Sequence, residues 1–66
     1  MKLITRYDLA SKSDLELRGQ YRKTFNNLVQ STPESAERRN TLASLENISR
    51  EINQRYSDQW QRDAAL

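Results

Sequence analysis

The chain has 66 residues, of which 11 are Lys or Arg and 9 are Asp or Glu, so that its formal net charge is +2. A chain this short buries only about 60% of the surface that its unfolded form exposes. It contains no Cys and no His, which excludes disulfides, the usual zinc ligands, thiol nucleophiles and imidazole bases. One Gly is too few for a glycine-rich phosphate loop. We therefore expect no catalytic residue, no metal, no cofactor and no small-molecule substrate.

The hydropathy of the chain argues against a membrane segment. No stretch approaches the roughly 18 apolar residues that a transmembrane helix needs. Residues 1–4 resemble the start of a signal peptide, but the polar residues 5–8 interrupt the apolar run. The sequence thus predicts a soluble, cytoplasmic protein.

The first twelve residues predict an arm that contains one short helix. Thr5 and Asp8 have the spacing of a capping box, in which each side chain binds the backbone N–H of the other residue. We expect a helix of one or two turns at about 6–11, within an arm at 1–12.

A first long helix is predicted over residues 14–31. Ser13 and Glu16 form a second capping box immediately before it. Large apolar residues then recur at intervals of four, four and three, which is one face of a helix. They are Leu17, Tyr21, Phe25 and Leu28.

A second long helix is predicted over 33–57, and residues 63–66 are expected to fray. Thr32 supplies a capping hydroxyl, and Pro33 stands at the first helical position, where its missing N–H costs nothing. The apolar stripe of this helix is Leu42, Leu45, Ile48, Ile52 and Tyr56, extended by Trp60.

The link at residues 31–33 is so short that the two helices must be antiparallel neighbours. Folding the chain there pairs residues whose numbers sum to about 65, such as Leu17 with Ile48. The sequence predicts an all-α fold, an antiparallel two-helix hairpin with a short N-terminal helical arm, as a single domain over 1–66. The expected core packs Leu17, Tyr21, Phe25 and Leu28 against Leu42, Leu45, Ile48 and Ile52.

In this arrangement the second helix extends past the start of the first. Tyr56 and Trp60 then lack a partner on the first helix. The same register places Leu9 near Tyr56 and Ile4 near Trp60, so that the arm is expected to cover both rings. If the arm does not cover them, Tyr56 and Trp60 become candidate partner-binding residues, because Tyr and Trp are enriched at interface hot spots.

Five of the eleven basic residues are mostly explained as solvated helix faces. These five follow an acidic residue by four positions, which is the favourable orientation on a helix. The other bases lie largely in the first half of the chain. A basic cluster on the two helices could contact nucleic-acid phosphates. Its members are Arg18, Arg22, Lys23, Arg38 and Arg39.

The run Glu37-Arg-Arg-Asn-Thr-Leu-Ala-Ser-Leu-Glu-Asn-Ile48, with Leu17, Tyr21-Arg22 and Phe25-Asn26 upstream, resembles small uncharacterised helical proteins of bacteria. These proteins are associated with mobile or integrated genetic elements. The resemblance covers about residues 3–53. It implies a bacterial accessory protein and brings no functional residue with it.

Two functions remain. The first is a non-enzymatic protein-interaction or regulatory module, in which a helix face binds a protein partner or a second copy of the chain. Such a role suits a chain whose dozen large apolar residues form only a marginal core. The alternative is a small nucleic-acid-associated accessory protein that uses the basic cluster. An enzyme is the least favoured class.

Overall fold

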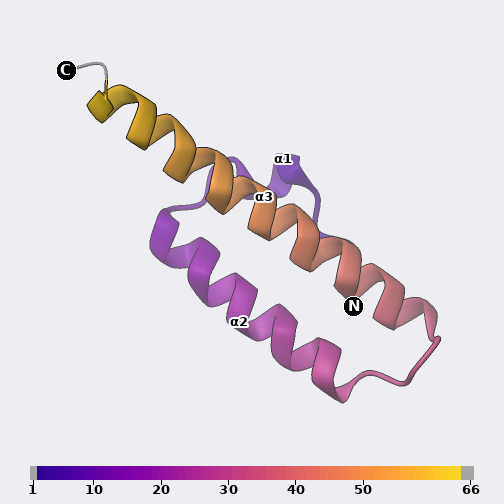
Figure 1. The fold of residues 1–66 in the computed structure, drawn as a ribbon. Helices are drawn as coiled ribbons and strands as arrows, with labels where there is room; N and C mark the ends of the chain where they lie inside the picture. The colour runs from indigo at the N-terminus through magenta and orange to yellow at the C-terminus, as the bar shows by residue number, and fades with distance from the viewer. Residues whose placement is uncertain (1, 65–66) are drawn as a thin grey trace.

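The computed structural model describes the backbone of residues 2–64 and the side chains of residues 2–58. Over these residues the chain forms α1 (Arg6–Leu9), α2 (Asp14–Gln30) and α3 (Ala36–Ala64). The long helices α2 and α3 lie side by side and run in opposite directions, and α1 lies against α3 (Figure 1). No strand occurs in the described part, so the prediction of an all-α protein is confirmed.

Both predicted capping boxes are present. The Thr5 hydroxyl accepts the Asp8 N–H at 3.2 Å, and the Thr5 N–H donates to the Asp8 carboxylate at 3.0 Å. Ser13 and Glu16 repeat this exchange at the start of α2, with both bonds at 3.1 Å. The backbone N–H bond from the capping residue, and then its hydroxyl, hold the pKa of Asp8 and of Glu16 below their ordinary values.

The helix α3 begins at Ala36, three residues later than predicted. Glu34 adopts a left-handed backbone conformation with φ of 65°, which a helix starting at Pro33 does not permit. Ser35 takes the place predicted for Thr32, because its hydroxyl accepts the Arg38 N–H at 3.0 Å. At the other end α3 continues to Ala64, past the predicted end at 57. Of the tail expected to fray, residues 65 and 66 lie outside the described residues.

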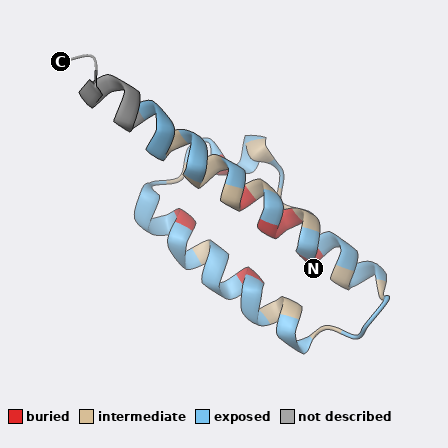
Figure 2. Cartoon of the chain, viewed as in Figure 1, coloured by how far each residue is buried: buried red, intermediate tan, exposed pale blue. Residues whose placement is uncertain are grey.

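The buried apolar residues gather where α1, α2 and α3 meet. Leu9, Leu17 and Ile48 are completely buried and form one cluster, against which Ile4 and Ile52 pack. Figure 2 shows this small buried zone between surfaces that are largely exposed. The radius of gyration of 13.6 Å exceeds the roughly 11 Å of a compact domain of this length. The molecule is therefore elongated around a small core.

Polar side chains continue the line between α2 and α3 toward the turn, together with the buried Leu45. Thr24 and Thr41 are completely buried, and their numbers sum to 65, as do those of Leu17 and Ile48. The Thr41 hydroxyl donates to the Glu37 carbonyl at 2.8 Å. Ser44, also buried, accepts a backbone N–H from the arm. Because these hydroxyls have partners, they occupy the contact line without an unpaired polar group.

The predicted core is wrong at three positions, since Tyr21, Phe25 and Leu42 are all exposed. The line that faces α3 runs from Leu17 to Thr24 at a spacing of seven residues, close to two turns. Tyr21 and Phe25 stand about 40° and 80° away from that line around the helix axis. Both rings therefore lie at the edge of the contact instead of inside it.

The arm runs in the opposite direction to the one predicted. The Leu9 and Ala10 carbonyls accept the Arg55 guanidinium, so the end of the arm lies near α3 where expected. From there the arm turns back along α3: the Ile4 N–H donates to Ser44 and its carbonyl accepts from Asn47, both at 2.9 Å. It therefore does not follow the overhanging end of α3.

The reason for this direction is main-chain hydrogen bonding. An extended segment that packs against a helix needs hydrogen-bond partners for the N–H and C=O groups that the packing removes from water. Ser44 and Asn47 offer an acceptor and a donor on one side of α3, and Arg55 offers donors about two turns further on.

No helix within the described residues is long and apolar enough to cross a membrane.

Candidate partner-binding face

One side of the helix pair carries large apolar side chains that nothing in the described structure covers. Their exposed fractions are 39% for Tyr21, 47% for Phe25, 47% for Leu42 and 72% for Tyr56. We call these four residues the apolar face. Single exposed apolar residues are ordinary, but a row of them marks an interaction surface.

Helix geometry places these four residues on one side. Tyr21 and Phe25 are four residues apart on α2, and their rings stack with centroids 6.5 Å apart and planes 15° from parallel. Leu42 and Tyr56 are fourteen residues apart on α3, which is close to four complete turns. Phe25 and Leu42 differ by only two from the pairing register, so the two rows lie next to each other along the molecule.

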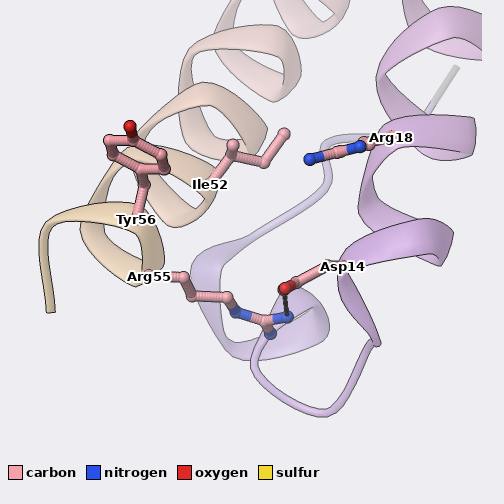
Figure 3. A pocket seen from close by; sticks show the side chains of 5 residues that line it. All are labelled: Asp14, Arg18, Ile52, Arg55 and Tyr56. Carbon is pink, nitrogen blue, oxygen red and sulfur yellow. Dashed lines mark hydrogen bonds and ion pairs between the residues drawn. The ribbon is translucent and has the colours of Figure 1, made fainter. Parts of the chain in front are cut away.

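A small pocket of about 80 Å³ lies at the end of this face nearest the arm. Ile52 and Tyr56 of α3 form one wall, and Arg18 of α2 forms the other (Figure 3). Asp14 and Arg55 close it below the apolar wall. The pocket places Tyr56 and the α2 residues near Arg18 on the same side of the molecule.

Arg55 holds the floor of the pocket in place. Its guanidinium donates to the Leu9 carbonyl at 3.1 Å and to the Ala10 carbonyl at 3.3 Å. It also pairs with the Asp14 carboxylate at 3.0 Å and with that of Glu51 at 3.6 Å. One planar group thus joins the end of α1, the start of α2 and the side of α3, which a lysine could not do.

Arg18 differs from Arg55 in having no such partner. Its guanidinium extends from α2 toward Ile52, into the pocket (Figure 3). It makes no hydrogen bond or ion pair with the residues whose side chains the structure describes. The pocket therefore combines an apolar wall with a guanidinium, that of Arg18, which no described carboxylate contacts.

The structure separates the basic cluster that the sequence suggested. Arg18 and Arg22, one turn apart on α2, both border the apolar face. Lys23 is turned about 100° from Arg22, and Arg39 is turned by the same angle from its neighbour Arg38. Lys23 is exposed but does not share the side on which Arg18 lies, whereas Arg39 is exposed about one turn before Leu42, next to the apolar face.

Arg38 has a structural role in addition to its charge. It is half-buried, and its guanidinium donates to the Leu28 carbonyl at 3.3 Å and the Ser31 hydroxyl at 3.4 Å. It therefore closes the carboxyl end of α2, where helix carbonyls lack partners. Only part of its donor capacity remains for an external ligand.

Of the two aromatic residues that the arm was expected to cover, the structure describes the side chain of Tyr56 alone. Tyr56 is largely exposed, so the expectation that the arm covers it is wrong. The cause is the direction of the arm, which places Ile4 beside Ser44 and Asn47. The side chain of Trp60 lies outside the described residues.

No group of three or more acidic residues that could hold a metal ion occurs in the described part of the chain. Among the described residues, the carboxyl groups whose pKa is shifted are those of Asp8 and Glu16, which are exposed and belong to helix caps. Their lowered pKa favours the ionised form, which accepts the capping hydrogen bonds. The capping boxes account for both shifts.

Tyr21, Phe25 and Leu42 are surface residues, although their spacing predicted them in the core. A signal was present in the small residues Thr24 and Thr41, which continue the line of Leu17 and Ile48 at helical spacing. A β-branched polar residue can occupy such a line when its hydroxyl bonds back to the helix, as that of Thr41 does.

Searches for similar proteins found no matching family model, curated protein or solved structure.

Proposed function

We propose that this chain is a non-enzymatic protein-interaction or regulatory module. Its working unit is an antiparallel two-helix hairpin with an N-terminal helical arm. The hairpin presents the apolar face to a protein partner or to a second copy of the chain. The non-enzymatic part of the proposal depends on the sequence, which has neither His nor Cys.

The observation that carries the proposal is the exposure of Tyr21, Phe25 and Leu42 on one side. Each aromatic ring can bury roughly 150–250 Å² when it is covered. Covering the exposed parts of the three rings of this face, together with Leu42, would remove several hundred Å² of apolar surface from water. That is a substantial part of the roughly 800 Å² that each partner buries in a standard interface.

A site-specific cross-link tests this function. A photoreactive phenylalanine analogue in place of Leu42 is expected to form a discrete adduct in cells of the native host. The same analogue in place of Gln30, an exposed residue of α2 about 140° around the helix from Phe25, is the control. The adduct from position 42 should disappear in a Phe25→Ser background. Equal adducts from both positions, or none from position 42, would contradict the proposal.

A second function is favoured by one observation. Arg18 and Arg22 have no ion-pair partner among the described residues, and they border the stacked rings of Tyr21 and Phe25. Exposed rings among free cations suit a single-stranded nucleic acid, whose bases stack while its phosphates are neutralised. Arg38, Lys23 and Arg39 would add phosphate contacts.

Gel shifts on single- and double-stranded DNA at low and high salt test this alternative. If nucleic acid binds, each tenfold rise in salt should lower the logarithm of the affinity by about one unit per phosphate that the protein neutralises. Substitution of Lys23 or Arg39 should then weaken binding as much as substitution of Arg18. The absence of any shift at low salt would exclude it.

A further inference from the structure

The carboxylates around the apolar face have partners within the molecule. The carboxylate of Asp14 is paired with Arg55, and that of Glu46 is paired with Arg50. The carboxylates of Asp8 and Glu16 accept backbone N–H groups in the capping boxes, on the other side of the helices. The acidic groups nearest this side are therefore already engaged inside the molecule.

Two cations of the same side, Arg18 and Arg22, have no such partner among the described residues. The Arg18 guanidinium extends into the pocket beside Ile52 and Tyr56. A second copy of the chain on this face would offer Arg18 and Arg22 only carboxylates that already have partners, such as Asp14 and Glu46. A partner with carboxylates around its apolar contact residues would be complementary in charge.

The dimensions of the face indicate the shape of that partner. Leu42 and Tyr56 are fourteen residues apart on α3, which corresponds to about 21 Å along the helix axis. A helix of about four turns matches this length when it lies along the face, with apolar residues on one side. The pocket of about 80 Å³ is far below the roughly 300 Å³ or more of a small-molecule site. It suits one side-chain carboxylate.

We propose that the apolar face binds an acidic amphipathic helix of a partner protein, with one Asp or Glu side chain of that helix entering the pocket to pair with Arg18. This inference rests on the proposed protein-interaction function and names the partner's chemistry. The carboxylate accepts two parallel N–H bonds from the guanidinium, whose planar fork matches its geometry. Ile52 and Tyr56 shield the pair from water on one side, while Tyr21 and Phe25 bind the apolar residues of the partner.

The test uses two synthetic peptides of about 16 residues, each long enough for four helical turns. Both carry Leu along one side, and they differ only in having Glu or Lys on the flanks of that side. Binding of each fluorescently labelled peptide to the whole chain is followed by anisotropy. The Glu peptide is expected to bind about tenfold or more tightly than the Lys peptide.

Two charge reversals on α2 identify the pocket. Arg18→Glu should lower the affinity for the Glu peptide by about tenfold and raise the affinity for the Lys peptide. Lys23→Glu makes the same change in net charge about 140° further around the helix, so it should alter either affinity by less than about twofold. Both side chains are exposed, and circular dichroism confirms that each variant is folded.

Three results would overturn this inference: no binding of the Glu peptide, equal binding of the two peptides, or equal effects of Arg18→Glu and Lys23→Glu. An adduct from position 42 without binding of either peptide would support the protein-interaction function but exclude an acidic helix as the partner. An adduct with a second copy of the chain would also exclude the acidic helix. DNA binding that both reversals weaken equally would replace it with the nucleic-acid function.

Discussion

Gly19 is the position where the structure predicts a gain in stability from a single added methyl group. It lies five residues after Asp14 and eleven before Gln30, inside the 17-residue α2. Its backbone is not in the left-handed region that glycine alone adopts readily. A Cβ built at this position meets no atom within 4 Å, so Gly19→Ala introduces no clash and no new packing.

The size of the gain follows from helix propensity alone. Alanine in a helix interior is more favourable than glycine by about 0.8–1.0 kcal/mol, because glycine loses more backbone entropy on folding. A change of 1 kcal/mol shifts the melting temperature of a domain of this size by about 4–8 °C. Gly19→Ala should therefore raise the melting temperature by roughly that amount.

Thermal unfolding followed by circular dichroism at the helix band measures the effect. Gly19→Ser serves as an intermediate, since serine lies between glycine and alanine in helix propensity. The order of melting temperatures should be Gly, Ser, Ala, from lowest to highest. A melting temperature that is unchanged or lowered in Gly19→Ala would refute the reasoning, because it would mean that α2 is not an open helix interior at this position.

Three further outcomes are expected. Leu17→Ala should lower the free energy of unfolding in urea by about 2–5 kcal/mol. Phe25→Ala should lower it by less than half as much, because the ring is already half-exposed. Equal losses in the two variants would mean that Phe25 belongs to the core. Arg55→Lys should cost about 1–2 kcal/mol, since one ammonium cannot reach both arm carbonyls and the Asp14 carboxylate; an unchanged unfolding midpoint would show that these bonds contribute nothing. Because the pKa of Glu16 is lowered on folding, the stabilising effect of this group is present above its unfolded pKa and is lost as pH falls through the folded pKa. Glu16→Gln keeps the capping bond, so it should flatten the dependence of the unfolding free energy on pH between about pH 5 and 3. An unaltered pH profile would contradict this.

Local signals in the sequence were sufficient for the starts of α1 and α2. The Thr5–Asp8 and Ser13–Glu16 capping boxes each involve residues three apart, so they form without help from the rest of the chain. The pairing of Leu17 with Ile48 also followed from the sequence, because a short turn leaves few choices of register. These features depend on spacing alone.

The start of α3 could not be predicted in the same way. Thr32 followed by Pro33 is a strong start signal, but Glu34 has a left-handed backbone and Ser35 supplies the cap. A glutamate with positive φ is rare, and no local pattern indicates it. The turn must also span the distance between α2 and α3, which depends on how those helices pack.

The candidate face was hidden for a similar reason. A stripe of apolar residues covers a broad part of a helix surface, and periodicity does not show which edge of the stripe faces the neighbouring helix. Thr24 and Thr41 are the buried residues on the facing sides of α2 and α3. In that orientation of the two helices, the exposed side chains of Tyr21, Phe25 and Leu42 lie at the edge of the contact between them. Likewise, the direction of the arm depends on main-chain bonds to Ser44 and Asn47, which leave no pattern in hydropathy.

The uneven core has a consequence for hydrogen exchange. Leu9, Leu17 and Ile48 are buried at the arm end of the helix pair, while toward the turn the contact line contains Thr24 and Thr41 beside the buried Leu45 and the half-buried Leu28. Amides near the turn should therefore exchange through local openings of low free energy, and those around Leu17 and Ile48 only through opening of the whole chain. A partner helix on the apolar face would cover the less protected half and slow its exchange, so that binding would make the two halves of the molecule alike in protection.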